Sequence, residues 1–221
     1  MKIPSAALYG LIAATGAFAQ DDIPSDLKAD GPFALRVKGR CNSSIDGLLH
    51  AVDVYSFYDA QSVFHYEPAP ANVADNSSFR FYFNYTGRTQ SNDGYELGFF
   101  VSDITVGKPN GVGLLGKAMS WQYRPNTNIA LLSLGASAST VDYTGFGEDG
   151  KAFLNYYQDD AREVPEQPAN VSLSINYYEG WAICWETYYG ITGPTLSWIT
   201  TGKPHNPTCK RVDLIKSKLS L

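Results

Sequence analysis

The feature that most constrains this fold is a regular alternation of apolar and polar side chains. In residues 79–86, Phe79, Phe81, Phe83 and Tyr85 alternate with residues that are mostly polar, and residues 171–178 repeat the pattern. Successive side chains of a β-strand point to opposite faces, so a period of two indicates a strand with one buried face. The chain is therefore expected to fold mainly as β-strands.

Further strands are expected along the whole chain, with turn-forming residues between them. The turns fall at residues 92–94, 108–111, 148–150 and 192–194, which are rich in Gly, Pro, Asn and Asp. About a dozen short strands predict an all-β fold, an antiparallel β-sandwich or a jelly roll, with a closed barrel as the alternative. The further strands are 33–39, 51–58, 62–66, 95–101, 118–124, 129–134, 152–157, 180–189, 195–200 and 210–215.

The first nineteen residues have the pattern of a secretory signal peptide. Lys2 precedes an apolar run over residues 6–14, and Ala17 and Ala19 are the small residues that a signal peptidase requires. The apolar run is too short to span a membrane. We therefore expect residues 1–19 to be removed, residues 20–30 to form a polar arm, and residues 31–221 to form a single domain of a secreted protein, either extracellular or in a cell wall.

Export gives meaning to the acceptor pattern for N-linked glycans. The pattern Asn-x-Ser/Thr occurs at Asn42, Asn76, Asn84 and Asn170, whereas proline excludes residues 206–208. Together with the leader, four such sites indicate a eukaryotic glycoprotein. Because a glycan is bulky and polar, each modified residue should face solvent. Asn84 would then place the even-numbered side chains of strand 79–86 at the surface.

Three cysteines allow one disulfide, in any of three pairings, and leave one thiol. We favour Cys184 with Cys209, because this bond would tie the last predicted strand to strand 180–189. Cys41 would remain free beside the Asn42 site. If it is exposed in an oxidising compartment, it would form dimers or be capped. A buried thiol without a role is the alternative.

The last forty residues carry a family resemblance. The order of Trp, Cys, Tyr, Pro and Gly residues from Trp181 to Leu214 resembles the ending of secreted fungal proteins of the cell-wall or IgE-binding type, and residues 33–37 resemble their start loosely. The resemblance implies a fungal, cell-wall-associated protein whose paired cysteines hold the end of a β-sandwich. It implies no catalytic residues, and Cys41 is not part of the pattern.

Charge and motif content argue against several classes of function. The formal net charge is −5 and basic residues are scattered, which disfavours nucleic acid and anionic membranes as partners. The C-terminus lacks the features of a glycolipid-anchor signal, so no membrane anchor is expected. No Gly-x-Ser-x-Gly motif is present, and the three histidines are far apart in the sequence. We expect no cofactor and no metal site.

Glycoside hydrolysis is the enzymatic alternative, because jelly rolls can carry the two carboxylates that it needs. Glu179 and Glu186 flank residues 181–185, but a separation of seven places them on opposite faces and well over roughly 20 Å apart along a strand. Glu186 could still pair with a carboxylate elsewhere in the chain. On this strand Trp181, Ile183 and Trp185 are expected to face the core. Glu186 is then expected to face solvent or to bond a tyrosine.

Sugar binding without catalysis is the favoured function. Aromatic rings can stack on sugar faces. The candidate rings are those of Tyr82, Tyr178 and Tyr188, on faces predicted to point outward, and of Trp121 and Trp198. We expect a secreted, glycosylated, non-catalytic fungal protein that binds cell-wall polysaccharide or a host surface, and the alternative is a jelly-roll glycoside hydrolase.

Overall fold

The structure is a computed structural model, and it describes residues 28–55, 60–91, 93–105, 116–135, 143–156, 165–166 and 176–219. The predicted signal peptide lies outside the described residues, as do most of the predicted arm, the Asn170 site and the predicted turn at 108–111.

Thirteen antiparallel strands form one continuous sheet in the described part of the chain, which confirms the all-β prediction. Two short 3-10 turns, η1 (Val73–Asp75) and η2 (Ser77–Phe79), separate the third strand from the fourth. The strands are β1 (Lys28–Gly39), β2 (Asp46–Tyr55), β3 (Ala60–Glu67), β4 (Phe81–Gln90), β5 (Glu96–Thr105), β6 (Gly116–Gln122), β7 (Ile129–Gly135), β8 (Thr144–Phe146), β9 (Ala152–Tyr156), β10 (Asn176–Tyr178), β11 (Trp181–Tyr188), β12 (Ile191–Ile199) and β13 (Lys210–Ser217).

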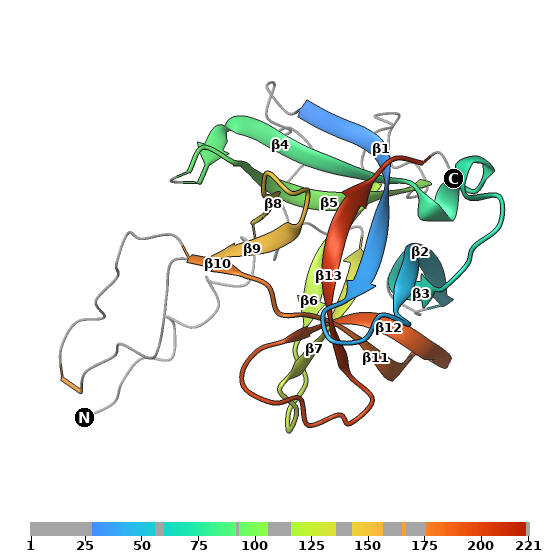
Figure 1. The fold of residues 1–221 in the computed structure, drawn as a ribbon, viewed down its shortest axis with the longest axis vertical. Helices are drawn as coiled ribbons and strands as arrows, with labels where there is room; N and C mark the ends of the chain where they lie inside the picture. The colour runs from blue at the N-terminus through green and yellow to red at the C-terminus, as the bar shows by residue number, and fades with distance from the viewer. Residues whose placement is uncertain are drawn as a thin grey trace, which may run out of the picture.

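The sheet folds back on itself to give a sandwich-like architecture. Hydrogen-bonded neighbours run from β5 through β4, β1, β13, β11, β12 and β7 to β6, and β6 pairs with β5 again. In Figure 1, β4 and β5 lie at the end of the molecule where β1 starts, and β11 and β12 lie at the other end. The sheet thus surrounds a common core, and its turns and loops at the β11–β12 end are available to form a site.

Aromatic and aliphatic side chains from nearly every strand fill this core. Trp181 is completely buried, and its indole N–H donates a hydrogen bond of 2.7 Å to the carbonyl of Ala152 on β9. The rings of Trp181 and Trp198 meet edge to face at a centroid distance of 4.8 Å, and Trp121 packs against Trp198 in the same way. The three tryptophans therefore join β6, β9, β11 and β12 through the core.

Several strand boundaries differ from the sequence expectation. β1 begins at Lys28, so the end of the predicted polar arm is a strand that pairs with β4. β2 begins at Asp46 rather than at residue 51, and the short strand β8 was not expected from the sequence. Strand pairing in the folded protein has extended or created these elements where local alternation is weak.

The predicted turn at residues 192–194 is wrong, because these residues lie within β12. The hairpin instead turns at Tyr189 and Gly190, whose φ angles of 44° and 82° are both positive, as a two-residue turn of the type I′ class requires. Gly193 lies in the strand beneath His65. A Cβ atom at this position would lie 2.9 Å from Cε1 of that histidine, so the strand needs glycine for close packing.

The predicted orientation of Asn84 is also wrong. Asn84 is only 4% exposed, and Phe83 on the opposite face of β4 is also 4% exposed, so the strand is covered on both faces at this point. In contrast, Asn42 and Asn76 are exposed. Their Oδ1 atoms accept hydrogen bonds from the backbone N–H of Ser44 and Ser78, so each side chain is bonded to its own loop at the surface. Asn84 is thus poorly suited to carry a glycan in the folded protein.

Candidate functional site

The predicted disulfide is present and anchors the loop that precedes β13. Cys184 and Cys209 are bonded with their Cα atoms 4.1 Å apart, and both pack in a small buried cluster with Ile129, Ala182 and Ile199. The bond thus fixes the end of the 200–209 loop to the middle of β11. Cys41 is a free, exposed cysteine.

Asn128 joins the 200–209 loop to the loop between β6 and β7. Its Nδ2 atom donates hydrogen bonds to the carbonyls of Thr201 and Lys203, at 2.7 and 2.8 Å. Its Oδ1 atom accepts a hydrogen bond of 2.9 Å from the backbone N–H of His205. The two loops are therefore held against each other by one amide side chain, even though about 75 residues separate them in the sequence.

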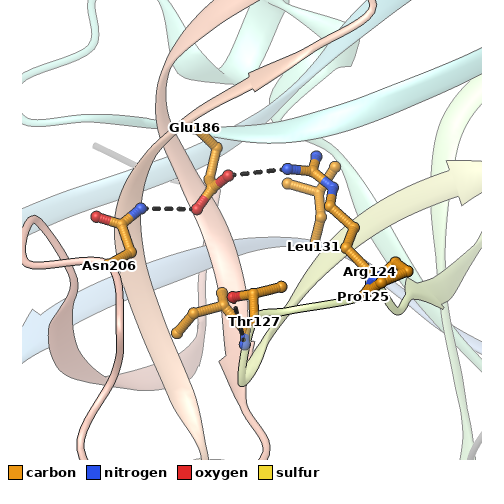
Figure 2. Close-up of a pocket in the computed structure, with 7 residues that line it drawn as sticks. Arg124, Pro125, Thr127, Leu131, Glu186 and Asn206 are labelled. Carbon is orange, nitrogen blue, oxygen red and sulfur yellow. Dashed lines mark hydrogen bonds and ion pairs between the residues drawn. The ribbon is translucent and has the colours of Figure 1, made fainter.

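A pocket of about 330 Å³ lies between these two loops and the end of β11 (Figure 2). Its apolar part comes from Ile129 and Leu131, on the face of β7 that points away from the main core. Polar side chains supply the rest of the wall. The lining residues are Arg124, Pro125, Thr127, Ile129, Leu131, Glu186 and Asn206.

Glu186 is the central polar group of this pocket. Its Oε2 atom accepts a hydrogen bond of 3.1 Å from Nη1 of Arg124, and its Oε1 atom accepts one of 2.8 Å from Nδ2 of Asn206. The side chain is only 13% exposed. The expectation that Glu186 faces solvent or bonds a tyrosine is therefore wrong, because two loops that lie elsewhere in the sequence close over it.

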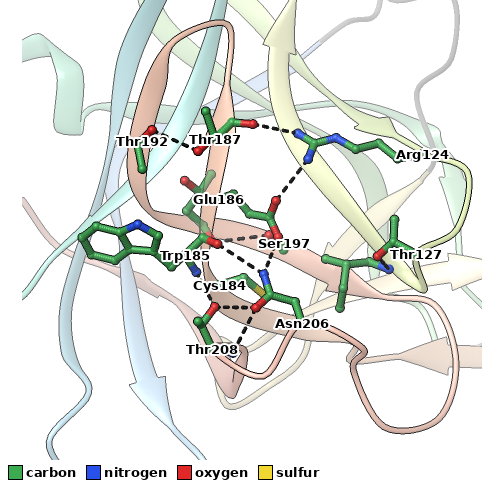
Figure 3. A network of polar contacts seen from close by, with 12 residues as sticks. Arg124, Thr127, Cys184, Trp185, Glu186, Thr187, Thr192, Ser197, Asn206 and Thr208 are labelled. Atoms are coloured by element: carbon green, nitrogen blue, oxygen red, sulfur yellow. Dashed lines mark hydrogen bonds and ion pairs between the residues drawn. The ribbon is translucent and has the colours of Figure 1, made fainter.

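A second layer of hydrogen bonds fixes Asn206 itself (Figure 3). Nδ2 of Asn206 also donates to the carbonyl of Trp185, at 3.2 Å, and Oδ1 accepts from the backbone N–H and the hydroxyl of Thr208. The same Thr208 hydroxyl accepts a hydrogen bond of 2.9 Å from the backbone N–H of Trp185. The carboxylate of Glu186 is thus held in one orientation before any ligand arrives.

Tyrosine rings continue from this polar wall. The guanidinium of Arg124 lies over the ring of Tyr188, 5.8 Å from its centroid, and the ring of Tyr189 lies 4.5 Å from that of Tyr188. Tyr189 is 59% exposed, and Tyr123, next to Arg124 in the chain, is 66% exposed. The exposed ring of Tyr189 is thus linked to the pocket residue Arg124 through the ring of Tyr188.

The five aromatic residues predicted to bind sugar have different positions. Trp121 and Trp198 are buried in the core, so their proposed stacking role is wrong. Tyr82 on β4 and Tyr178 on β10 are half-buried and do not line the pocket. Tyr188 alone lies beside it, through its contact with Arg124.

Trp185 is on the side of β11 expected to face the core, yet it is 59% exposed. The expectation holds for Trp181 and Ile183, which are buried in the core. It fails at residue 185 because β11 has by then extended past the main core, so the same face of the strand is open to solvent. A tryptophan exposed to this degree is a second aromatic surface near the end of the β11–β12 hairpin.

In the described part of the chain, Glu179 and Glu186 do not form the pair of carboxylates that a glycoside hydrolase requires. Glu179 binds Arg40, which also donates a hydrogen bond of 2.6 Å to Asp213 on β13. Glu179 is absent from the pocket, and Glu186 is the one carboxylate among the described residues that line it. The described wall therefore offers one acidic group held by a cation, rather than an acid and a base on two sides of a bond.

Two of the three histidines, His50 and His65, form a pair that the sequence did not indicate. His50 on β2 and His65 on β3 are direct cross-strand neighbours, with ring centroids 6.0 Å apart, and Phe79 packs against His50. Burial lowers the pKa of both imidazoles from the usual 6.5. The carboxylate of Glu67 is 3.6 Å from Nδ1 of His50 and opposes this shift. Within the described ranges, no group of three or more His, Cys, Asp or Glu side chains is arranged to hold a metal ion.

Over the described part of the chain, no helix has the length and apolar character needed to cross a membrane. No protein-family model matches the chain, and no curated protein and no solved structure shows significant similarity to it.

Proposed function

We propose that this chain is a secreted, glycosylated, non-catalytic fungal protein that binds cell-wall polysaccharide, and that the Glu186 pocket is its binding site. One observation carries the proposal: the Glu186 carboxylate is held between Arg124 and Asn206 in a concave surface close to exposed tyrosine rings. Pockets with a few convergent polar groups and an apolar remainder are the usual form of small-ligand sites.

The chemistry of the pocket suits a sugar. A pyranose ring presents hydroxyl groups at its edge and C–H groups on its faces, so it needs fixed hydrogen-bonding partners together with an aromatic or aliphatic surface. Glu186 and Arg124 supply the first, and Ile129 and Leu131, which are only 4% and 1% exposed, form the apolar floor beneath them. The exposed ring of Tyr189 offers a further platform for the next sugar unit of a polymer.

Secretion and glycosylation rest on three features of the chain. Its first nineteen residues have the signal-peptide pattern, and a disulfide is typical of a protein from an oxidising compartment. Asn42 and Asn76 are exposed acceptor sites with free approach to solvent. The fungal cell wall as the location is supported by the resemblance of the last forty residues.

The absence of catalysis is proposed from the makeup of the described pocket. Glycoside hydrolysis uses one protonated and one ionised carboxyl group on opposite sides of the bond that is cleaved. Glu186 is engaged by a guanidinium and an amide, which suits an ionised acceptor that binds rather than a proton donor. No observation favours the hydrolase over the binding protein.

A pull-down on insoluble polysaccharides tests the proposal. Purified protein is incubated with chitin, β-glucan and mannan, and both the retained protein and the reducing sugar released into solution are measured. We expect retention on at least one polymer without release of sugar. Loss of the Tyr189 ring in Tyr189→Ala should weaken retention about fivefold, since an aromatic contact contributes roughly 1 kcal/mol. Tyr143→Ala removes an exposed tyrosine that precedes β8 and lies outside the pocket, and it serves as the control.

Two results would overturn the proposal. Release of reducing ends that depends on Glu186 would make the protein a hydrolase. A lack of retention on all three polymers would exclude polysaccharide binding and would direct attention to a host protein as the partner.

A further inference from the structure

We propose that the Glu186 pocket selects uncharged sugars, and that Glu186 recognises them by accepting hydrogen bonds from two neighbouring hydroxyl groups. The inference rests on the proposed polysaccharide binding and adds to it the class of sugar and the roles of Glu186, Arg124 and Asn206. It follows from the unused hydrogen-bonding capacity and from the charge of the pocket wall.

Glu186 has acceptor capacity left for a ligand. An ionised carboxylate can accept about four hydrogen bonds, two on each oxygen. Among the described residues, Asn206 uses one position on Oε1 and Arg124 uses one on Oε2. One position on each oxygen therefore remains, and the side chain borders the pocket. Two hydroxyl groups on adjacent carbons of a sugar ring are spaced to donate to the two oxygens of one carboxylate.

Asn206 is a positioning residue rather than a ligand contact. Its two amide protons are engaged by the carbonyl of Trp185 and by Glu186. Its carbonyl oxygen accepts two hydrogen bonds from Thr208. With both donors and both acceptor positions occupied, Asn206 has nothing to offer a sugar and acts by holding the carboxylate in place.

The charge of the wall favours a neutral ligand. Arg124 and Glu186 are the charged residues of the lining, and they form an ion pair with each other. The guanidinium also donates toward the carbonyl of Thr187, at 3.4 Å. An anionic sugar would bring its carboxylate close to Glu186 with no unmatched cation in the described wall to attract it, so its desolvation would not be compensated. Uronic acid polymers are therefore excluded, and neutral hexose polymers are accepted.

The test compares a neutral and an anionic polymer on the same variants. The affinities of wild type, Glu186→Gln and the control Glu148→Gln are measured for soluble β-1,3-glucan, mannan, a chitin oligosaccharide and polygalacturonate. Glu148 is an exposed carboxylate outside the pocket. Glu186→Gln should lose about tenfold or more in affinity for the neutral polymer that wild type binds, because a charged acceptor becomes a neutral one. It should also gain binding to polygalacturonate, because the charge of Arg124 is no longer matched.

A second variant keeps the inference testable if Glu186→Gln does not fold. Arg124→Gln leaves the carboxylate without its cation, so we expect weaker binding of the neutral polymer with no gain for polygalacturonate. A merely structural role of the two residues would not reverse the response to the anionic polymer. Thermal unfolding of each variant reports whether it is folded.

The outcomes separate this inference from the proposed function. Wild-type affinity for the neutral polymer in Glu186→Gln, or binding of polygalacturonate by wild type, would overturn the selection of uncharged sugars while leaving polysaccharide binding intact. A wild-type protein that binds none of the polymers would overturn the proposed function and the inference with it.

Discussion

The Cys184–Cys209 disulfide is expected to contribute a large share of the stability of the proposed binding site. The bond closes a loop with a sequence separation of 25 residues, which contains Tyr189, Asn206 and the whole of β12. For a loop of this length the chain-entropy relation gives about 3.5 kcal/mol at room temperature. For a domain in the size range of 150–250 residues, that difference lowers Tm by roughly 7–14 °C.

Reduction of the wild-type protein isolates the effect of this bond, because no residue is replaced. Tm is measured by tryptophan fluorescence with and without a phosphine reductant, and the free energy of unfolding is measured by urea titration. Cys41→Ala is the matched control, since it removes an exposed cysteine outside the bond and should change stability by less than about 0.5 kcal/mol.

The same experiment has a functional readout. The disulfide holds the 200–209 loop, and that loop supplies the Asn206 contact to Glu186. Reduced protein that is still folded should therefore bind polysaccharide more weakly than oxidised protein. A fall in Tm of less than about 3 °C, with unchanged binding, would refute the reasoning that this bond organises the site.

Three further predictions concern the core, the histidine pair and the glycans. Trp181→Phe should cost about 2 kcal/mol in urea unfolding, because it shortens a fully buried ring and leaves the carbonyl of Ala152 without its donor. Burial lowers the pKa of His50 and His65 in the folded protein, so as pH falls the unfolded chain takes up protons at a higher pH than the folded protein does. The free energy of unfolding should therefore decrease as pH falls through 6.5. Replacing both histidines by glutamine should flatten this dependence, and an unchanged slope would contradict it. Peptide mass mapping of protein from a fungal host should find no glycan on Asn84.

Side-chain alternation predicted most of the strands because the apolar residues at every second position are the ones that are buried. Phe81 and Phe83 face the core as their spacing indicated. The alternation could not predict which polar residues are buried, since the second face of a strand in a closed sheet can also be covered. Asn84 shows this limit: its neighbours in the sequence imply a surface face, and the packing of the folded sheet removes it from solvent.

The β11–β12 hairpin shows why its turn could not be placed from composition. Gly193 and Pro194 are typical turn residues, but here glycine makes room for His65 in a strand. The actual turn uses Tyr189 at a positive φ angle, which is an uncommon choice for an aromatic residue. The local sequence preference and the tertiary packing place the turn at different residues, and the packing determines where it forms.

The candidate site was only partly accessible from the sequence. Cys184 and Cys209 could be paired because each has a clear place relative to a predicted strand. Glu186 was recognised as a polar residue on an aromatic strand, but its partners Arg124 and Asn206 come from loops that precede and follow it by 62 and 20 residues. No spacing rule links such segments, and only the folded sheet brings them together.

Chemical-shift mapping can locate the surface at which a sugar binds. Isotope-labelled protein is titrated with a neutral oligosaccharide of the polymer that retains it, and the backbone amide signals are followed. Binding at Glu186 should give saturable shifts that cluster at Arg124, Glu186 and Asn206, and these shifts should be lost in Glu186→Gln but not in Glu148→Gln. Shifts confined to another surface, or no shifts at millimolar sugar, would contradict it.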